Sequence, residues 1–462
     1  MIIMKFGGTS IQDTTAIKRI SETILQRKSE HPAVVVSAIG NSTDSLEEMS
    51  AVAAQKDRRQ AYALAIQFIS FHKKLAHALG CDDDSGLQAV FTSVENDLRR
   101  IVDNILQSGH VARHIRDELS SLGEYCSAHI ITAYLNSIGC DSRVVDAREI
   151  IVTDSQFGNA HPLVEESSIK IKQILKPVAE KDTIAVMQGF IGRDTFGRTT
   201  TLGRGGSDYS ATFIGAILKA DRVEIWSDVD GVLTADPSIV PKARRIRYMS
   251  FQEAAELAYF GAKVLHPSSL LPAIEHGIPV RVLNSNRPDY AGTEISDQKP
   301  KGQQHCVFKS IAYKEGITVI KVSSTRMLMA YGFIASIFEI FERYQTPVDL
   351  ISTSEVSVSI TIDDTSRLSE IRRELLRFAQ VEVLQKKAIV CLVGEALKRE
   401  TAVTGSIFSE LSDFVVYQIS HGASDINISF VIDEENISPV VNTLHTLFFK
   451  NGADERLFGS EL

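Results

Sequence analysis

The sequence lacks the features that mark disulfide-linked, zinc-binding and membrane-spanning proteins. Its 462 residues include five cysteines, at positions 81, 126, 140, 306 and 391, and no two of them form a CxxC pair. An odd number of scattered cysteines in a long chain is typical of free thiols in a reducing compartment. Apolar runs such as residues 184–187 are much shorter than the roughly 20 residues that cross a bilayer. We therefore expect a cytoplasmic protein that has no membrane partner.

An excess of positive charge is also absent. The sequence has 49 Lys and Arg against 58 Asp and Glu, which gives a formal net charge of −9. This balance provides no general attraction for nucleic acid, so we expect no nucleic-acid partner, and any bound anion must be held by local basic residues. The 12 prolines and the apolar content of 44% are typical of a globular chain. Its length indicates about three domains at roughly 150 residues each.

Two unlike parts follow one another along the chain. Residues 1–295 alternate short apolar strands with longer helical patterns, which predicts one large α/β sandwich around a mainly parallel sheet. A helical block at residues 44–138 interrupts the alternation and is expected to form a lobe over one edge of the sheet. Smaller ferredoxin-like βαββαβ units are predicted at residues 308–386 and 387–462, and the two units are expected to be able to interlace. The polar residues 285–307 form the predicted linker.

The first of three glycine-containing loops is KFGGTS at residues 5–10, where the first predicted strand ends. A pair of glycines lets the backbone approach an anion without interference from Cβ atoms. Thr9 and Ser10 are expected to cap the following helix, whose amide-rich N-terminus would then face a phosphate. Lys5 adds a full positive charge at the end of the strand. A tight turn without a ligand remains an alternative for this segment taken alone.

The second loop, TTTLGRGGSD at residues 199–208, combines three threonine hydroxyl groups, three glycines, an arginine and a Ser-Asp pair. A flexible surface loop with Ser207 and Asp208 at a helix start is the simpler interpretation. That interpretation does not explain why glycines flank Arg204 on both sides. Arginine suits bidentate recognition of a carboxylate or phosphate, and flanking glycines leave space for the ligand. We therefore expect this loop to bind an anion.

The third segment, WSDVDGV at residues 226–232, ends a predicted strand in an acidic turn, and FGAKVLHP follows at 260–267. In open α/β sheets, ligands bind at the carboxyl ends of strands. Plain Asp-Gly and Asp-Pro turns are the alternative. The patterns of a Walker A loop, a GxGxxG dinucleotide loop, a GxSxG elbow and a HExxH zinc helix are all missing from the sequence, and these would indicate other chemistries.

Together these segments resemble the signature motifs of aspartokinases. The resemblance includes KFGGTS at 5–10, TTTLGRGGSDYSA at 199–211, WSDVDGV at 226–232 and FGAKVLHP at 260–267, in the family's order. It covers essentially the whole chain. It implies the amino-acid kinase fold, a mainly parallel eight-stranded sheet between helices, followed by two regulatory ACT domains. Residues 327–362 resemble most the lysine-sensitive, monofunctional branch of the family.

The resemblance implies that ATP phosphorylates the side-chain carboxylate of L-aspartate to give 4-phospho-L-aspartate, the first step of lysine, threonine, methionine and diaminopimelate biosynthesis. A carboxylate with a pKa of about 4 is already ionised at neutral pH, so the reaction needs no strong general base. The difficulty is to bring two anions together, which makes positioning and charge stabilisation the main tasks. Mg²⁺ is expected to be held mainly by the nucleotide phosphates, and no metal-binding residues are predicted.

Each matched residue acquires an implied role. Lys5 would bridge the ATP phosphates, Gly7 and Gly8 would supply amides, and Asp208 would orient the lysine ammonium. Arg204 would bind the α-carboxylate of aspartate. The remaining implied contacts are Ser37, Thr43, Glu124 and Ser207 for the amino acid, and Ser227, Asp228 and Lys263 for the nucleotide.

Two departures from the family pattern concern the nucleotide side. The family commonly has Tyr at the position of Leu233, and Arg at the position of Ser238 after Asp236 and Pro237. Adenine contacts and ATP affinity are therefore expected to differ from those of relatives. The charged residues of the predicted centre are all present, which argues against an inactive kinase.

L-lysine is the expected allosteric inhibitor, bound by the first ACT unit. Asp349 and Glu355 could serve its ammonium groups. ACT pairs typically build such sites between subunits, so a homodimer or a larger assembly is implied. An ordinary packed core is the alternative for this helix–strand face. The implied contacts are Met327, Gly332, Phe333, Val348, Asp349, Ser354 and Glu355.

Two other functions remain open at this stage. Another amino-acid kinase, for N-acetylglutamate or glutamate, would share the fold, although it would not explain the two ACT units. A non-catalytic amino-acid sensor could have kept the fold without the chemistry.

Overall fold

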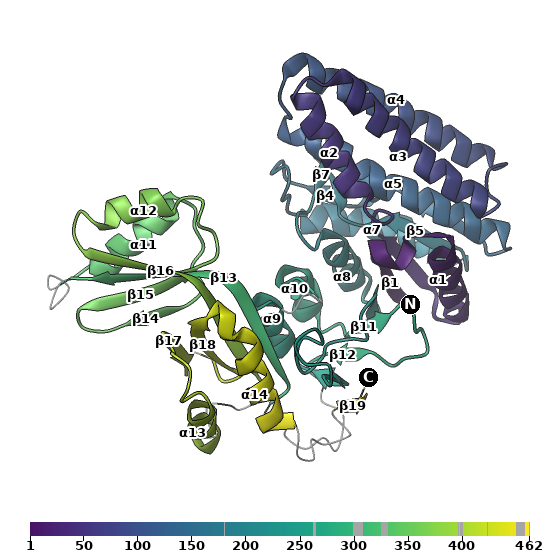
Figure 1. Cartoon of the computed structure of the whole chain (residues 1–462). Coiled ribbons are helices and arrows are strands. Elements are labelled where there is room, and N and C mark those ends of the chain that lie inside the picture. Colours follow the sequence, from purple (N-terminus) through teal and green to yellow (C-terminus); the bar gives the residue numbers. More distant parts are fainter. Residues whose placement is uncertain are drawn as a thin grey trace. The chain divides into compact units, whose positions relative to one another are not determined.

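The computed structural model describes residues 1–179, 181–261, 265–298, 308–324, 331–395, 397, 401–422, 424–449 and 458–461 (Figure 1). The chain forms two compact units, and each unit combines two stretches of sequence. The first unit contains Met1–Val232 and Val264–Gln298, and the second contains Leu233–Lys263 and Lys299–Leu462.

A mainly parallel sheet forms the centre of the first unit, as the sequence predicts. The strands that the first unit contributes to this sheet lie in the order β12-β11-β8-β1-β2-β5-β3. All neighbouring pairs from β11 to β3 are parallel, and β12 is antiparallel to β11. The strands are β1 (Ile2–Phe6), β2 (Pro32–Val36), β3 (Ser142–Val145), β5 (Ile184–Gln188), β8 (Arg222–Ser227), β11 (Val280–Asn284) and β12 (Thr293–Ile295).

Alternation along β1 assigns its side chains to two helical layers. Ile2, Met4 and Phe6 belong to the core cluster that includes residues of α1 (Thr14–Gln26) and α5 (Arg113–Ser137). Ile3 faces the opposite layer, where α8 (Gly206–Leu218) approaches it through Gly215. Lys5 has the same parity as Ile3, so its side chain leaves the strand on the side of α8.

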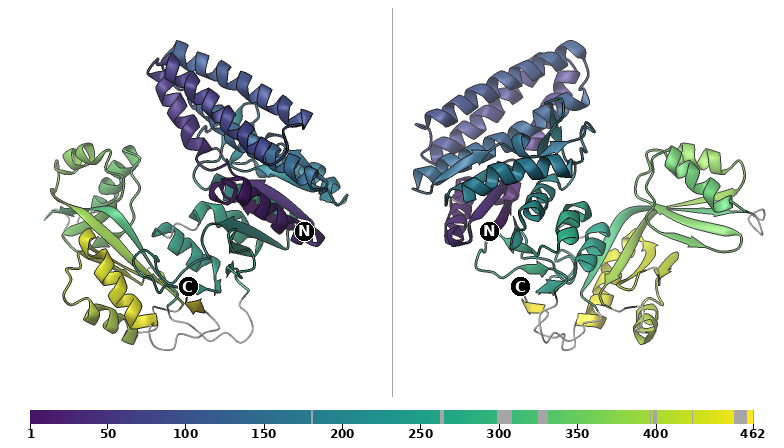
Figure 2. Two further views of the ribbon diagram at one scale, coloured as in Figure 1. Left: turned by 45° about the vertical axis from the view of Figure 1, so that its right-hand side comes forward. Right: turned by 180° about the vertical axis from the view of Figure 1, so that it is seen from behind.

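Long helices form the predicted lobe, which the views of Figure 2 show as a stack of nearly parallel rods. Its apolar interior is made by residues such as Leu46, Ala61, Val94 and Leu122, one from each helix. The helices are α2 (Ser42–Ala54), α3 (Arg58–Ala78), α4 (Ser85–Ser108) and α5. Because α5 also contacts β2, β3 and β5, it belongs both to the lobe and to the central sandwich.

A small three-stranded sheet connects the central sheet to the second glycine loop. The pattern over residues 183–191 predicts one strand, but the chain turns at Gly189 and Phe190 and continues as a separate strand. The three strands are β4 (Val152–Thr153), β6 (Ile191–Asp194) and β7 (Thr199–Thr201), and β7 forms the first three residues of the loop segment. Helices α6 (Ala147–Ile150), α7 (Val164–Ala179) and α10 (Pro267–His276) complete the described helices of this unit.

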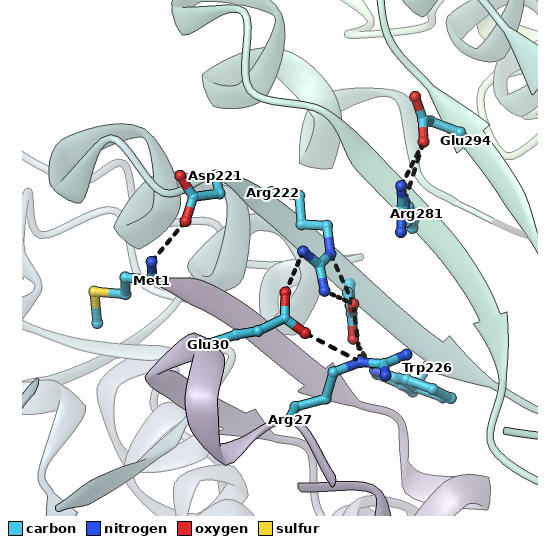
Figure 3. A network of polar contacts seen from close by, with 9 residues as sticks. Met1, Arg27, Glu30, Asp221, Arg222, Trp226, Arg281 and Glu294 are labelled. Atoms are coloured by element: carbon cyan, nitrogen blue, oxygen red, sulfur yellow. Dashed lines mark hydrogen bonds and ion pairs between the residues drawn. The ribbon is translucent and has the colours of Figure 1, made fainter. Parts of the chain in front are cut away.

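A buried polar network fixes strand β8 within the first unit (Figure 3). The carboxylate of Glu224, which is 0% exposed, accepts hydrogen bonds from Arg222 Nε at 2.8 Å and from Trp226 Nε1 at 3.1 Å. Arg222 also pairs with Glu30 at 2.6 Å, and Arg27 lies 3.5 Å from Glu224. The fully buried Glu224 carboxylate is paired, which is the condition under which a buried ion is tolerated, whereas Arg27 and Glu30 are partly exposed. The network holds the strand that ends at Ser227.

The second unit is built on a six-stranded antiparallel sheet with the order β14-β15-β13-β16-β18-β17. Its strands are β13 (Ser310–Ser323), β14 (Ile351–Thr353), β15 (Ser357–Ile362), β16 (Gln380–Val393), β17 (Gln418–His421) and β18 (Asn427–Asp433). The helices beside it are α11 (Phe333–Arg343), α12 (Leu368–Leu375), α13 (Thr401–Glu410) and α14 (Ile437–Phe449). This arrangement confirms the predicted pair of ferredoxin-like units.

The two βαββαβ units share their central strands. The second half of β13 pairs with β15 and with Gln380–Leu384 of β16, whereas its first half pairs with Lys387–Val393. Residues 310–314 therefore supply a strand to the second βαββαβ unit, although the sequence places them at the beginning of the first one. Figure 1 shows β13 and β16 running the whole width of this sheet.

Residues 233–263 belong to the second compact unit. They contain β9 (Arg244–Ile246), β10 (Tyr248–Met249) and α9 (Phe251–Tyr259). Glu253 of α9 forms a 2.7 Å ion pair with Lys309, and both side chains are at most 5% exposed. The sequence-based domain boundaries at residues 295, 308 and 387 stay predictions. The two compact units follow a different division of the chain.

Candidate active site

A pocket of about 370 Å³ lies at the carboxyl ends of β1, β2 and β5, inside the first unit. This is the edge at which open α/β sheets bind their ligands. Eight of the residues predicted from the sequence line it: Lys5, Gly8, Ser37, Thr43, Glu124, Arg204, Ser207 and Asp208. Residues that are 200 positions apart in the sequence are thus brought into one cavity.

An ion pair between Lys5 and Asp208 stands at the centre of this pocket. Lys5 Nζ lies 2.6 Å from Asp208 Oδ1, and the two side chains are 10% and 14% exposed. Asp208 lies in the first turn of α8, where the helix dipole favours a negative charge. The helix begins at Gly206 after Gly205 as N-cap, without a side-chain capping bond. The alternative interpretation, in which Ser207 and Asp208 only cap a helix, therefore does not hold, because both residues lie inside the first turn of α8.

Gly205 occupies a position that only glycine fits. Its φ is +72°, and a Cβ atom there would lie 2.6 Å from the Cβ of His266. The His266 side chain thus packs directly on the backbone beside Arg204. Burial and the charge of Arg204 lower the pKa of His266 from 6.5, while Asp208 opposes this shift.

The first glycine loop differs from expectation in its capping. Thr9 and Ser10 lie in a 3-10 turn (Gly8–Ile11), and the cap of α1 is Asp13, which accepts a hydrogen bond from Ala16 N. Gly8 is required by close packing, because a Cβ atom there would lie 2.8 Å from the carbonyl oxygen of Ala38.

Gly7 has a structural contact that its predicted role did not include. Its N–H donates to the carbonyl oxygen of Trp226 at 3.1 Å, which joins the ends of β1 and β8. If this N–H also donates to a phosphate, as predicted, it must serve two acceptors, the phosphate and the Trp226 carbonyl oxygen. A Cβ atom at Gly7 would lie 3.5 Å from Lys5 Nζ, so the absence of a side chain leaves the ammonium group accessible.

Glu124 is a buried carboxylate with an unsatisfied oxygen. It is 4% exposed, and its Oε2 has no hydrogen-bond partner in the described part of the chain. Burial raises the pKa of Glu124 to about 8, and the backbone N–H groups of Glu124 and Ala38 oppose this only in part. The ionised form of such a carboxyl group needs a cationic partner, because leaving it ionised and unpaired is costly.

Two of the residues predicted to contact the nucleotide lie at the end of β8. Ser227 is its last residue, and its carbonyl oxygen accepts from Ser285 N at 2.8 Å. Asp228 is exposed in the turn that follows. Lys263 lies outside the described residues. Ser238, in the second unit, donates from its hydroxyl to Asp236 Oδ1 at 2.6 Å, so it closes a local turn.

The structure adds pocket residues that the sequence did not indicate. Phe190 lines the pocket with its backbone at φ +69°, an uncommon conformation for an aromatic residue. Strain of this kind clusters at functional sites. Its only sequence signal was a glycine before it at the end of an apolar run. The other additional lining residues are Ala38 and Gly40, whereas Gly203, Gly205 and Gly206 are the loop glycines that the sequence had indicated.

The predicted effector residues are spread over the first ferredoxin-like unit. Asp349 has a side chain that is 3% exposed, and its Oδ1 accepts from Lys314 Nζ at 2.7 Å and from Tyr259 OH at 3.1 Å. Ser354 and Glu355 are exposed at the turn between β14 and β15. Met327 lies outside the described residues. Gly332, Phe333 and Val348 are the remaining ones, at the N-cap of α11, its first position and the loop before β14.

Comparison with known proteins decides the family. The sequence profile described as "Amino acid kinase family" matches residues 1–284, and that described as "ACT domain" matches residues 390–448. The chain is 36% identical to aspartokinase 2, chloroplastic, of Arabidopsis thaliana over 97% of this chain and 84% of that protein. The chain belongs to the aspartokinases.

Two further comparisons place this aspartokinase beside an enzyme of Escherichia coli. It is 34% identical to lysine-sensitive aspartokinase 3 of strain K12, over 97% of this chain and 99% of that protein. The crystal structure of E. coli aspartokinase III in complex with aspartate and ADP, in the R-state, superimposes with a TM-score of 0.84 at 33% identity. The match covers 97% of this chain and 100% of that one.

Two general properties of this aspartokinase bear on its ligands. Across the residues that the structure describes, no helix has the length and apolar character needed to cross a membrane. Within the same residues, His, Cys, Asp and Glu side chains form no group of three or more that could hold a metal ion.

Proposed function

We propose that this aspartokinase transfers the γ-phosphoryl group of ATP to the side-chain carboxylate of L-aspartate. An oxygen of the carboxylate attacks the γ-phosphorus, the bond to the β-phosphate oxygen breaks, and 4-phospho-L-aspartate and ADP are released. The observation that supports this most is the Lys5–Asp208 pair in a cavity that also contains Arg204 and Glu124. No proton has to be removed from the nucleophile, so the residues act by positioning and by charge.

The amino-acid end of the substrate fits the polar groups of the pocket. Arg204 would clamp the α-carboxylate with help from Ser207, because a guanidinium group binds carboxylates with two parallel hydrogen bonds. Glu124 would receive the α-ammonium group, which supplies the partner that its buried oxygen lacks. Ser37 and Thr43 would complete this part of the cavity.

Lys5 would stabilise the transferring phosphoryl group, and Asp208 would hold the lysine ammonium in place. Gly8 would supply a backbone amide, whereas Gly7 would keep the approach to Lys5 open. Ser227, Asp228 and Lys263 would contact the rest of the nucleotide. Mg²⁺ would supply charge neutralisation on the phosphates. The donor set of the described residues fits an ion carried mainly by the nucleotide and its waters, since it forms no cage of carboxylates.

L-lysine is the proposed allosteric inhibitor, since a lysine-sensitive relative matches almost the whole chain. Its ammonium groups would be received by Asp349 and Glu355, with Met327, Gly332, Phe333, Val348 and Ser354 around them. The same ACT-type sheet would join two chains into a homodimer. The protein would act in the cytoplasm, in amino-acid biosynthesis.

Aspartate-dependent release of ADP tests the activity. Wild-type protein with ATP, Mg²⁺ and L-aspartate should release ADP, and hydroxylamine should trap the acyl phosphate as a hydroxamate. Glutamate and N-acetylglutamate at the same concentrations should give at most a small fraction of this rate. A rate equal to that of Lys5→Ala would instead identify a non-catalytic amino-acid sensor. Repeating the assay with lysine, threonine and both together identifies the effector.

A further inference from the structure

Helix α5 supports several parts of the amino-acid pocket at once. Its Ser127 hydroxyl donates to the carbonyl oxygen of Ser37 at 2.7 Å, which holds the end of β2. Gly123 allows the helix to approach Ala38, since a Cβ atom there would lie 2.8 Å from the Ala38 Cβ. Glu124 itself projects from the same helix into the pocket.

Asp117 lies seven residues before Glu124 on α5. Seven residues are about two helical turns, so the two side chains leave the helix on nearly the same face. Asp117 is 1% exposed. Its Oδ2 accepts hydrogen bonds from the backbone N–H of Gly158 at 2.9 Å and of Thr201 at 2.8 Å.

The two bonded amides belong to segments that are packed on each other. Ala160 N donates to the carbonyl oxygen of Thr201 at 2.9 Å. The backbone at Gly203 lies so close to Asn159 that a Cβ atom would be 2.5 Å from its side-chain oxygen. The turn at residues 158–160 and the start of the second glycine loop therefore move together, and Asp117 fastens both to α5.

Burial of the Asp117 carboxylate costs free energy, because it removes a charged group from water. Burial raises the pKa of Asp117, and the N–H groups of Gly158 and Thr201 oppose the rise. The proposed mechanism assigns it no role, because Asp117 does not line the pocket. Its contacts instead join the helix that carries Glu124 to the loop that carries Arg204.

We propose that Asp117 is a positioning residue for the amino-acid pocket, which fixes the separation of Arg204 and Glu124 by tying Thr201 to α5. The inference rests on the proposed function. The α-carboxylate and α-ammonium groups of aspartate are attached to one carbon atom, so the two protein groups that receive them tolerate little change in spacing. Arg204 follows Thr201 by only three residues, and thus a displaced Thr201 displaces the guanidinium group.

Steady-state kinetics of Asp117→Asn and Asp117→Ala provide the test. Asn keeps one acceptor oxygen but loses the charge, whereas Ala loses both bonds. We expect the KM for aspartate to rise at least tenfold in Asp117→Ala and by a smaller factor in Asp117→Asn, with the KM for ATP within twofold of wild type. If Asp117→Ala does not fold, Asp117→Asn still decides, because it should raise the KM for aspartate at least threefold.

Asp154→Asn is the matched control. Asp154 Oδ1 also accepts two backbone N–H groups of the same loop, from Gln156 and His161 at 3.1 Å, but these bonds do not reach β7 or α5. Its KM for aspartate should stay within twofold of wild type. An equal rise in Asp154→Asn, an equal rise in the KM for ATP, or an unchanged KM for aspartate in folded Asp117→Asn would each overturn the assignment. Failure of the proposed function would appear separately, as wild-type protein without aspartate-dependent ADP release.

Discussion

The ammonium group of Lys5 and the carboxylate of Asp208 lie 2.6 Å apart, although they are 203 positions apart in the chain. One comes from the end of β1 and the other from the first turn of α8. Strand alternation directs the odd-numbered side chains of β1 toward α8, so the pair follows from the fold. The arrangement holds a lysine charge at the point where two anionic substrates would meet.

Loss of this pair should abolish phosphoryl transfer without unfolding the protein. We expect kcat to fall at least 100-fold in Lys5→Ala, because it removes the charge proposed to stabilise the transition state. Asp208→Asn should lower kcat by a smaller factor, since the lysine remains but loses its partner. ADP release measured at saturating aspartate and ATP checks both. Lys18→Ala, at an exposed position of α1, should match wild type, and equal losses there would contradict the assignment.

Binding of aspartate should release a proton from Glu124. Burial raises the pKa of Glu124 to about 8, so in the empty pocket the carboxyl group is mainly neutral at pH 7. The α-ammonium group of aspartate favours the ionised form. The kcat/KM for aspartate should therefore rise from pH 6 to pH 8, by at most tenfold per pH unit, and level off above pH 8. Calorimetry in buffers of different ionisation enthalpy should detect the released proton.

Stability of the ligand-free protein should show the opposite dependence on pH. The pKa of Glu124 in the folded state lies above its ordinary value of 4.5, so the folded state binds more protons between pH 4.5 and 8. The contribution of this group to stability therefore falls as pH rises through that window. Glu124→Gln should remove both this dependence and that of kcat/KM. A variant that keeps the wild-type profiles would show that another group titrates.

Gly205→Ala should impair the enzyme more than backbone strain alone explains. Gly205 has φ +72° and lies against His266, whereas Gly80 has φ +73° and nothing within 4 Å of a Cβ atom. Alanine at either position meets a similar strain of about 1–2 kcal/mol. Gly80→Ala should lower Tm slightly and leave kcat/KM unchanged, whereas Gly205→Ala should lower kcat/KM at least tenfold. Equal effects would mean that the contact with His266 is unimportant.

Tyr259→Phe should increase sensitivity to lysine. The hydroxyl group of Tyr259 donates to Asp349, the proposed effector carboxylate, at 3.1 Å. An effector ammonium group would compete with this donor, so its removal should lower the half-inhibitory lysine concentration by about three- to tenfold, the effect of one net hydrogen bond. Inhibition curves at fixed aspartate measure this change.

Tyr344→Phe serves as the control, because the Tyr344 hydroxyl donates to Glu374 at 2.7 Å in the same sheet unit but does not touch Asp349. It should leave the inhibition curve unchanged. Asp349→Asn should raise the half-inhibitory concentration at least tenfold. If lysine inhibits Asp349→Asn as strongly as wild type, the effector site lies elsewhere.

Local sequence signals predicted Lys5, Arg204 and most of the sandwich, because glycine loops at strand ends and apolar runs depend on near neighbours. The roles of Asp208 and Glu124 came from the family resemblance. They failed where distant contacts decide the conformation. Helix α10, which begins at Pro267 and contains Pro272, was not among the predicted elements, although proline suits a first helical turn. Phe190 looked like part of a strand. Asp117 gave no signal, since its partner Thr201 is 84 residues away.

The shared strand β13 limits how the regulatory half can be reused by protein engineers. Residues 310–314 lie at the beginning of the first ferredoxin-like unit in the sequence, but they complete the sheet of the second one. A cassette that begins at residue 387 would lack that strand and would expose an open edge of β16, which invites association with other chains. Grafting feedback control onto another enzyme thus requires both sensors as one continuous piece that begins no later than Ser310.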